Sequence, residues 1–251
     1  MKSIFGLIGF PLSHSFSKEY FKNKFLTEGI ENAVYENFEL DDIDKINELI
    51  ISQPNLTGLN VTIPYKESII KYLATLDPDA RRVGAVNVVK KLSNGDLKGF
   101  NSDYYGFRLT LEKWMGQDLR TSRAVLMGTG GAAKAVMAVL EDCNIDYIKV
   151  SRTTGKDRIT YYDLREKPSL LRNYNLVINT TPLGMYPNIN EMPNLPYDSL
   201  REDMYLYDLI YNPEKTLFLQ KGESMGCKIM NGRDMLVLQA ERSWEIWNSK
   251  E

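Results

Sequence analysis

A glycine-rich turn near the middle of the 251-residue chain constrains the fold more than any other sequence feature. The apolar segment Arg123–Met127 runs directly into Gly128-Thr129-Gly130-Gly131-Ala132-Ala133, and a helical pattern follows over 134–140. A strand, Gly-x-Gly-x-x-Ala and a helix, in this order, form the fingerprint of a dinucleotide-binding βαβ unit. The first glycine makes the tight turn, Gly130 lets the backbone approach a pyrophosphate, and the helix N-terminus offers amides and a positive dipole.

The segments around this turn predict a two-domain α/β protein. Further strand patterns after the turn indicate a parallel sheet of the Rossmann type; they cover 147–150, 176–179, 205–209 and 227–230. Strand and helix patterns also alternate in the N-terminal part of the chain. We expect a domain boundary near Asp103 and an amphipathic last helix, Gly232–Trp247, that returns to the first domain. The expected domains are therefore 1–103 with 232–251, and 104–231.

Three local patterns complete the expected N-terminal domain. The segment Ile4–Gly9 predicts its first strand, and the spacing of Phe21, Phe25 and Leu26 predicts the buried face of a helix. A strand ends at Pro64, and a helix is expected over 66–76.

The strand that follows the glycine turn ends in a basic segment that indicates the cofactor. It reads Ser151-Arg152-Thr153-Thr154-Gly155-Lys156. An acidic residue at this strand end would bind a ribose 2′-hydroxyl and favour NAD. A guanidinium, an ammonium and hydroxyls suit a 2′-phosphate instead, so the segment predicts NADP. The alternative is a basic surface loop that binds no ligand.

The composition excludes several other classes of protein. The 31 Lys and Arg residues are balanced by 33 Asp and Glu, for a net charge of -2, which leaves no electrostatic footprint for nucleic acid. The single histidine, His14, and the two cysteines, Cys143 and Cys227, fit no metal-ligand spacing, so we expect no metal. No apolar stretch approaches the roughly 20 residues of a membrane span. We therefore expect a cytoplasmic protein with reduced thiols.

Hydride transfer at a carbon that bears oxygen also needs a group that moves a proton to or from that oxygen. His14 follows the first strand and is more readily a structural histidine in a turn. Tyr-x-x-x-Lys pairs occur at Tyr20 and at Tyr211. The first pair lies far upstream of the glycine turn, and the second contains Pro213, which is expected to begin a helix after Tyr211. Neither pair is a persuasive catalytic dyad.

Lys66 and Asp103 remain as candidates, each next to the end of an expected strand. An ammonium partnered by a carboxylate can act as a general acid or base. Pairs of opposite charge more often form surface salt bridges, so both interpretations stay open from the residues alone.

Taken together, the motifs along nearly the whole chain resemble those of the shikimate dehydrogenase family. The matching segments are 9–17 (Gly-Phe-Pro-Leu-Ser-His-Ser-Phe-Ser), 60–66 (Asn-Val-Thr-Ile-Pro-Tyr-Lys), 84–87 (Gly-Ala-Val-Asn), 101–103 (Asn-Ser-Asp), the turn at Gly128, 179–185 (Asn-Thr-Thr-Pro-Leu-Gly-Met), 207–213 (Tyr-Asp-Leu-Ile-Tyr-Asn-Pro) and 231–236 (Asn-Gly-Arg-Asp-Met-Leu). The resemblance implies NADP-dependent interconversion of 3-dehydroshikimate and shikimate, in the pathway to chorismate and the aromatic amino acids. It also implies small molecules as the partners, and a monomer or homodimer.

The resemblance further implies roles for individual residues. Lys66 and Asp103 correspond to the catalytic pair. The implied substrate ligands are Ser15, Ser17 and Tyr211 for a carboxylate, and Thr62, Asn87, Asp103 and Gln239 for ring hydroxyls. The implied cofactor residues are Gly128, Thr129, Gly130, Gly131, Ala132, Ser151, Arg152, Thr153, Lys156, Thr180, Leu209 and Gly232.

The sequence departs from the family pattern at a few positions. Lys18 stands where Pro is usual. It is either a positive charge near the substrate carboxylate or a solvated residue of a first helical turn, and we favour the second interpretation. Ser102 and Tyr104 replace Thr and Gly, so a backbone conformation that needs glycine cannot be assumed at position 104. Ser151 replaces Asn before Arg152, which affects the degree of the NADP preference and not its direction.

Two alternative functions remain open from the sequence. One is an NAD-using quinate dehydrogenase, or a dual quinate and shikimate dehydrogenase, of the same family. The other is a non-catalytic dinucleotide-binding sensor, for which the loss of Lys66 or Asp103 would be expected.

Overall fold

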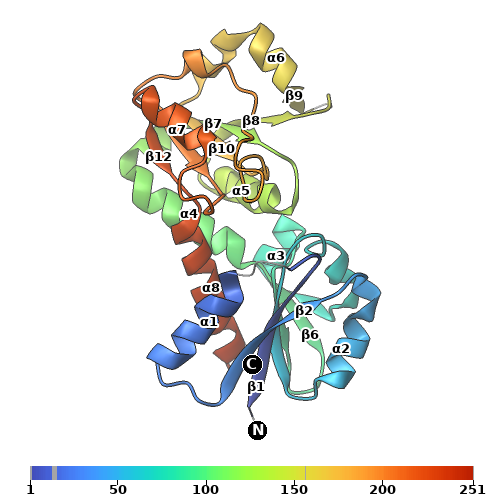
Figure 1. Ribbon diagram of the computed structural model, residues 1–251. Coiled ribbons are helices and arrows are strands. Elements are labelled where there is room, and N and C mark those ends of the chain that lie inside the picture. Colours follow the sequence, from blue (N-terminus) through green and yellow to red (C-terminus); the bar gives the residue numbers. More distant parts are fainter. Residues whose placement is uncertain (1, 13–15, 156, 251) are drawn as a thin grey trace. The chain divides into compact units, whose positions relative to one another are not determined.

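The computed structural model describes residues 2–12, 16–155 and 157–250. The chain forms two compact units (Figure 1). The first unit comprises Met1–Ser102 with Gln239–Glu251, and the second comprises Asp103–Leu238. The boundary expected from the sequence assigned 104–231 to the second unit and the whole last helix to the first. In the structure the last helix, α8 (Arg233–Asn248), is divided between the two units after Leu238.

The first unit is built on a mixed sheet in the order β2-β1-β3-β5-β6-β4. Its strands are β1 (Ser3–Gly9), β2 (Ala33–Glu39), β3 (Leu56–Val61), β4 (Thr75–Leu76), β5 (Val88–Lys91) and β6 (Leu97–Phe100). Both β2 and β3 pair with β1 in parallel, and β5 is antiparallel to β3 and β6. The carboxyl ends of β1, β2 and β3 therefore meet at one edge of the sheet, where β5 begins.

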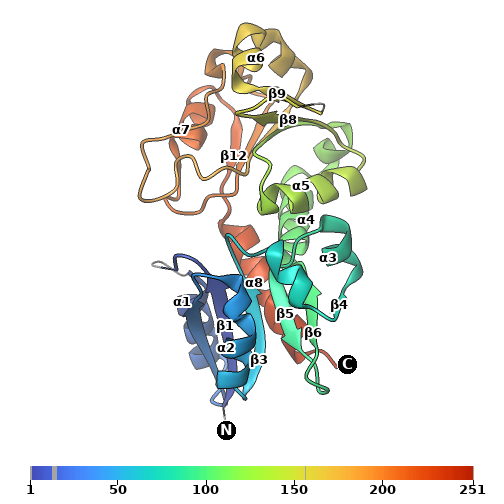
Figure 2. The ribbon, with the colours of Figure 1, turned by 90° about the vertical axis from the view of Figure 1, so that its right-hand side faces the viewer.

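Helices cover both faces of this sheet (Figures 1 and 2). Helix α1 (Phe16–Thr27) and the C-terminal half of α8 pack on one face, in a core that includes Phe5, Phe21 and Trp247. The other face is covered by the 3₁₀ turn η1 (Ile43–Lys45), α2 (Ile46–Ser52), the 3₁₀ turn η2 (Ser68–Tyr72) and α3 (Pro78–Val83). Each face of the sheet is therefore buried, as the alternation of strands and helices predicts.

Two expectations for the first unit are wrong. The segment 66–76 forms no continuous helix but the turn η2 followed by β4, and the Lys66 carbonyl accepts a hydrogen bond from the Val86 amide at 2.7 Å. A bond to a residue so distant in sequence competes with the helical pattern. Leu26 was expected on the buried face of α1 but is 82% exposed, while Phe21 and Phe25 are buried.

The second unit contains an entirely parallel sheet in the order β12-β11-β10-β7-β8-β9. Its strands are β7 (Arg123–Met127), β8 (Asp146–Ser151), β9 (Arg158–Thr160), β10 (Leu176–Asn179), β11 (Tyr205–Asp208) and β12 (Lys228–Met230). In chain order this is the 3-2-1-4-5-6 arrangement of the doubly wound Rossmann fold. The Rossmann-type α/β fold class predicted from the sequence is confirmed.

The helices of the second unit alternate with its strands along the chain and lie beside its sheet (Figure 1). They are α4 (Ser102–Met115), α5 (Gly131–Asp142), α6 (Tyr161–Glu166) and α7 (Leu217–Ser224), with 3₁₀ turns η3 (Gly116–Thr121), η4 (Pro168–Asn173) and η5 (Tyr197–Ser199). Pro213 does not begin a helix as expected: α7 starts after Thr216, whose side chain accepts a hydrogen bond from the Leu219 amide.

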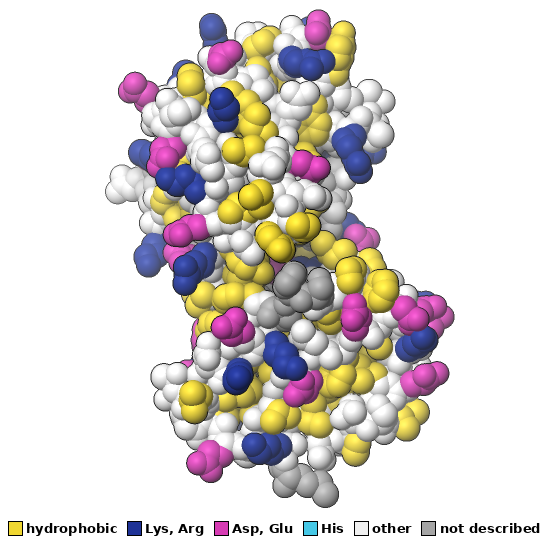
Figure 3. Space-filling view, in the orientation of Figure 1, with side chains coloured by type: hydrophobic (Ala, Val, Ile, Leu, Met, Phe, Trp, Pro, Cys, Tyr) yellow, Lys and Arg dark blue, Asp and Glu magenta, His cyan; other side chains and the backbone are white. Residues whose placement is uncertain are grey.

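The described residues lack the features of two other classes of protein. None of their helices is long and apolar enough to cross a membrane. Within the same ranges, no group of three or more His, Cys, Asp and Glu side chains has a geometry that could hold a metal ion. On the face drawn in Figure 3, basic and acidic side chains are interspersed, in keeping with the small net charge.

A close contact between Gly58 and Trp247 predicts a sensitive position in the first unit. A Cβ at Gly58 would lie 2.2 Å from Cδ1 and Nε1 of Trp247. That indole is 4% exposed, and its Nε1 donates to the Val89 carbonyl at 3.0 Å. We expect Gly58→Ala to lower the free energy of unfolding by about 1–3 kcal/mol, measured by urea unfolding followed by tryptophan fluorescence. Gly130→Ala is the matched control, because no atom lies within 4 Å of a Cβ there; equal stability of the two variants would contradict the prediction.

Candidate active site

The glycine turn lies at the carboxyl end of β7 and opens α5. Gly128 has a φ of +104°, and its amide donates to the Val150 carbonyl at 3.1 Å. A Cβ at this position would lie 2.5 Å from Oγ1 of Thr180, so both its backbone conformation and its surroundings require glycine. Gly130 is the N-cap of α5 and supplies no capping side chain, and the space where its Cβ would lie is open. The first amides of α5 thus have an open approach, which fits a pyrophosphate.

This turn is also next to the point where the sheet reverses its order. Strands β7 and β10 are neighbours, and the chain leaves them towards β8 and β11 on opposite sides. Thr180, just after β10, donates to the Met127 carbonyl from its amide at 3.0 Å and from its hydroxyl at 2.6 Å. Ligands of doubly wound sheets bind in the crevice at such a switch point. The turn at Gly128 and Thr180, both named from the sequence, are brought together here.

The basic segment after β8 forms a tight turn. The Ser151 hydroxyl donates to the Thr153 carbonyl at 2.6 Å and accepts from the Thr153 amide at 3.3 Å. Arg152 is exposed. Burial raises the pKa of the nearby Tyr161 to about 12, and the positive charge of Arg152 opposes this shift. Lys156 lies outside the described residues.

A second arginine in this loop escaped the sequence analysis. Arg158, the first residue of β9, packs against Gly155, and its Nε is buried with no hydrogen-bond partner in the described part of the chain. A buried donor without a partner is costly, and an oxyanion would satisfy it. Only the pairing of β9 with β8 brings this guanidinium back to the Arg152 loop, so the sequence carried no local signal for it.

A buried carboxylate connects the ends of β10 and β11. Asp208 has no exposed surface and accepts hydrogen bonds from Asn179 Nδ2 at 3.0 Å, the Ile210 amide at 3.0 Å and Thr216 Oγ1 at 2.6 Å. Asn179 in turn accepts from the amide and hydroxyl of Thr181, at 3.0 and 2.6 Å. Burial raises the pKa of Asp208 to about 6, against the opposing effect of these hydrogen bonds. The network fixes the loops that begin at Thr180 and Leu209.

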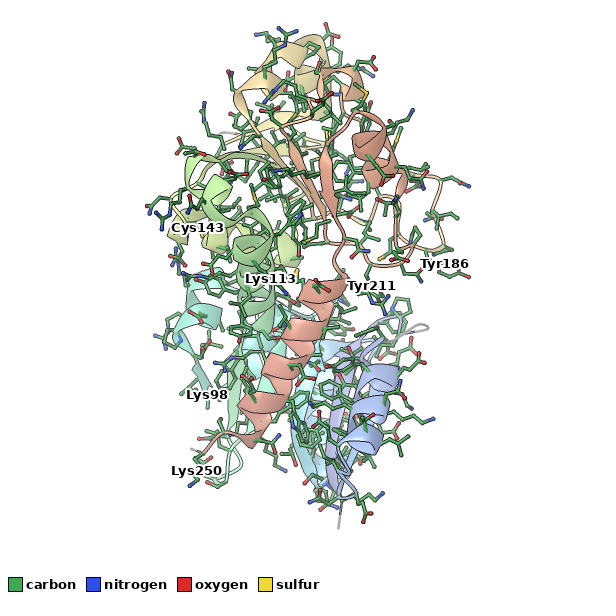
Figure 4. All side chains as sticks on the ribbon, turned by 90° about the vertical axis from the view of Figure 1, so that its left-hand side faces the viewer. Lys98, Lys113, Cys143, Tyr186, Tyr211 and Lys250 are labelled. Atoms are coloured by element: carbon green, nitrogen blue, oxygen red, sulfur yellow. The ribbon has the colours of Figure 1, made fainter. Side chains whose placement is uncertain are left out.

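Gly232 brings the start of α8 against the loop after β11. Its amide donates to the Ile210 carbonyl at 3.0 Å, and a Cβ would lie 2.0 Å from the Leu209 carbonyl oxygen. Leu209 and Gly232, both expected near the cofactor, are therefore in contact. Tyr211 follows in the same loop (Figure 4), and burial raises its pKa.

A polar network lies at the carboxyl edge of the first unit's sheet. Asn60 accepts from the Tyr35 hydroxyl at 2.8 Å and donates to the Ser243 hydroxyl at 2.9 Å and to the Asn87 carbonyl at 3.3 Å. Asn87 accepts from the Ser102 amide at 2.7 Å and donates to the Ser102 hydroxyl at 3.0 Å. This hydroxyl also donates to Oε1 of Gln239, at 3.4 Å. The network brings Asn87 and Gln239 together, as the resemblance implied, and adds Asn60, which the sequence analysis did not select.

The remaining expected residues are divided between the units. Thr62 and Lys66 follow β3 in the first unit, and Ser17, in the first turn of α1, forms a hydrogen bond with the Tyr35 hydroxyl. Asp103 is buried in the first turn of α4, at the start of the second unit. The pairing of Lys66 with Asp103 stays a prediction. Ser15 and His14 lie outside the described residues.

The departures from the family pattern have structural explanations. Lys18 is about half exposed and pairs with Glu36 at 2.6 Å, in keeping with a solvated residue of the first turn of α1. Tyr104 is helical within α4, so no glycine conformation is needed there. Its hydroxyl donates to Asp142 at 2.5 Å and accepts from Arg108 at 3.0 Å, which connects α4 to the end of α5.

Tyr20 and Lys24 of the first Tyr-x-x-x-Lys pair attach α1 to α8. Both donate to Glu241, and Lys24 also pairs with Glu28 at 2.6 Å. Burial and the hydrogen bond to Glu241 raise the pKa of Tyr20. A tyrosine with a raised pKa that is bound to a carboxylate is a poor proton carrier, so this pair is structural.

The fold and the glycine turn define a protein of the dinucleotide-binding α/β class. The proteins to which its sequence is similar identify it as an oxidoreductase. The family model "Shikimate dehydrogenase substrate binding domain" matches residues 7–89. Curated shikimate dehydrogenases (NADP(+)) from Methanococcus aeolicus and Clostridium beijerinckii are 36% and 39% identical; each alignment covers 97% of this chain and 91% of the relative. A crystal structure of a shikimate dehydrogenase in complex with NADP+ is similar, with a TM-score of 0.85 and 34% identity over 100% of this chain and 91% of that one. The chain belongs to the shikimate dehydrogenase family.

The raised pKa of Asp208 predicts a specific pH dependence of stability. In the folded state the pKa of this carboxyl is about 6, above its ordinary value of 3.8. The folded protein therefore binds the proton more tightly than the unfolded chain does. The stability contribution of this group therefore falls as the pH rises from about 4 to about 6, by on the order of 3 kcal/mol. Asn at this position keeps an acceptor for Asn179 and Ile210, places an amide donor near Thr216 Oγ1 and removes the titration.

The measurement is urea unfolding of the wild type and Asp208→Asn from pH 4 to 7. We expect the wild type to lose stability relative to the variant as the pH rises. A difference that stays constant over this range would contradict the raised pKa.

Proposed function

We propose that this chain catalyses the NADP-dependent, reversible reduction of 3-dehydroshikimate to shikimate, a step towards chorismate and the aromatic amino acids. The observation that carries the proposal is the Gly128 turn at the switch point of a Rossmann sheet, in a chain of the shikimate dehydrogenase family, with Arg152 rather than an acidic residue after β8.

The two units divide the task in this proposal. The first unit binds the substrate, because the substrate-binding family model matches within it and its polar network lies at the carboxyl edge of its sheet. Ser15 and Ser17 of this unit bind the substrate carboxylate, and Thr62, Asn87 and Gln239 bind ring hydroxyls. Tyr211, which belongs to the second unit, is a further ligand of the carboxylate. Asn60 positions Asn87, because every hydrogen-bonding atom of the Asn60 amide already has a partner within the protein.

The second unit holds the cofactor. The amides at the start of α5 bind the pyrophosphate, and Gly128, Thr129, Gly130, Gly131 and Ala132 shape that turn. Arg152 binds the 2′-phosphate together with Ser151, Thr153 and Lys156, and the unpartnered Nε of Arg158 supports an anion in this loop. Thr180, Leu209 and Gly232 would hold the cofactor beside this turn, where the Asp208 network fixes the loops.

The chemical step needs one hydride and one proton. NADPH, when bound, supplies the hydride to the carbonyl carbon. Lys66 donates a proton to the carbonyl oxygen as it becomes an alkoxide and accepts it back in the reverse direction, and Asp103 binds the same hydroxyl and orients the lysine. The proposed protein acts in the cytoplasm as a monomer or homodimer on these small molecules, without nucleic acid, membrane or metal.

Substitution of Lys66 tests the proton transfer. We expect Lys66→Ala to lower kcat at least about 100-fold with a much smaller change in the KM for shikimate. Lys66→Arg keeps the charge but holds its proton too firmly to transfer it, so kcat falls while KM is retained. Steady-state assays at saturating NADP measure both variants, and near-full kcat in Lys66→Ala would remove Lys66 from the mechanism.

Substitution of Arg152 tests the cofactor assignment. We expect Arg152→Asp to weaken NADP at least about tenfold and to change NAD little, because a charge-assisted bond to phosphate is lost and a repulsion gained. Arg165→Asp, on the exposed face of α6, is the matched charge control. Assays of each cofactor, NADP or NAD, with each substrate, shikimate or quinate, give the ratio of the activities with the two cofactors. An unchanged NADP-to-NAD ratio would place the 2′-phosphate elsewhere, and a preference for quinate and NAD would support the alternative activity.

A further inference from the structure

One peptide group of the first unit is hydrogen-bonded at both of its ends. It joins Ala85 to Val86, both fully buried in the segment between α3 and β5, and is called the 85–86 peptide below. Its carbonyl accepts a hydrogen bond from Nδ2 of Asn101 at 2.9 Å, and its N–H donates to the Lys66 carbonyl at 2.7 Å. Because a peptide group is planar and rigid, its two ends cannot turn independently. The Asn101 amide therefore sets the direction of the N–H that holds Lys66.

The donor and acceptor roles in this arrangement are fixed. The carbonyl of the 85–86 peptide can only accept, so the Asn101 amide must present its nitrogen to it. The Lys66 carbonyl can also only accept, so it needs the N–H at the other end of the peptide. Asn101 is itself 6% exposed, so water has little access to replace its amide. A hydrogen bond at one end of a peptide group also polarises the group and strengthens the bond at its other end.

The next residue of the same segment is held by other bonds. The Asn87 amide donates to the Phe100 carbonyl at 3.1 Å, and the Asn87 side chain accepts from the Ser102 amide at 2.7 Å. Neither bond involves the Asn101 side chain. Loss of that side chain therefore acts on the 85–86 peptide and leaves the attachment of Asn87 in place.

The segment that begins at Lys66 has a competing local conformation. Its sequence predicts a helix over 66–76, in which the Lys66 carbonyl would accept from the Ile70 amide. In the structure the Ile70 amide donates to the Glu67 carbonyl at 3.2 Å, and the 85–86 peptide holds the Lys66 carbonyl. Without that hold, the helical pattern extends back to Lys66 and turns its backbone. The direction of a side chain follows the backbone of its own residue, so the Lys66 ammonium is then displaced.

We propose that Asn101 is a positioning residue for the proton transfer. Through the 85–86 peptide, its amide holds Lys66 in the conformation in which Lys66 exchanges a proton with the substrate oxygen. This role rests on the proposed function of Lys66. Asn101 acts through the backbone, whereas Asp103, two residues later in the chain, is proposed to bind the substrate itself.

The test combines Asn101→Ala with Lys66→Ala in steady-state assays with shikimate and NADP. We expect Asn101→Ala alone to lower kcat about tenfold, because a small displacement of a reacting group is enough for such a loss. The KM for NADP stays unchanged, since the proposed pyrophosphate and 2′-phosphate residues belong to the second unit. In the Lys66→Ala background there is no ammonium to displace, so adding Asn101→Ala lowers kcat less than about twofold.

Asn175→Ala is the matched control. The Asn175 side chain accepts from the Arg123 amide at 3.0 Å, so it also holds a backbone group, at the start of β7. We expect this variant to keep the wild-type kcat. If Asn101→Ala does not fold, Asn101→Ser replaces it, because its side chain is one atom shorter and falls short of the carbonyl of the 85–86 peptide.

Amide hydrogen exchange, followed by NMR, gives a readout that needs no activity. We expect the Val86 amide to exchange at least about tenfold faster in Asn101→Ala than in the wild type, and the Asn87 amide to keep its rate. Unchanged exchange at Val86, full kcat in Asn101→Ala, or the same fold loss of kcat with and without Lys66 would overturn this role of Asn101. A wild type without dehydrogenase activity, or near-full kcat in Lys66→Ala, is a different result, which would overturn the proposed function and this role with it.

Discussion

The close approach of Gly128 to Thr180 is the contact on which the proposed cofactor site of the second unit depends. A side chain at Gly128 would collide with the Thr180 hydroxyl, which itself binds the carbonyl at the end of β7. With glycine there, β7 and β10 end side by side, and the chain then diverges to opposite halves of the sheet. The start of α5, which no side chain caps, follows directly after β7 at this point of divergence. One missing Cβ therefore permits both the turn and the approach of a pyrophosphate.

In each unit, a network of buried polar groups fixes the arrangement of the surrounding loops. In the second unit, Asp208 carries a desolvation cost, visible in its raised pKa, and three donors partly offset it. In the first unit, Asn60 has a similar role without a charge, because neutral hydrogen bonds join it to β2, to Asn87 just before β5 and to α8. Networks in which every polar group has a partner favour a single arrangement of loops, since any other arrangement leaves a buried polar group without a hydrogen bond.

The sequence predicted those elements whose signals are local. Strands β7 and β10 have the expected bounds, because each is a short apolar run between turn residues. The helix expected over 66–76 failed because the Lys66 carbonyl is engaged by Val86, a partner that no local pattern reveals. Leu26 fitted the helical spacing as well as Phe25 did, but the sheet is covered by only part of that stripe. Arg158 was overlooked for the same reason, since its importance comes from the pairing of β9 with β8.

The sequence by itself determined the class of fold, the place of the glycine turn, the basic strand end that favours NADP and the family. Each of these rests on a residue type that a particular backbone conformation or ligand requires, so a short segment is enough to express it. Only the tertiary structure decided which polar groups are buried together and which charges lack a partner. The Asp208 network and the unpartnered Nε of Arg158 both depend on desolvation. Desolvation is set by segments distant in the chain that exclude water from the same place.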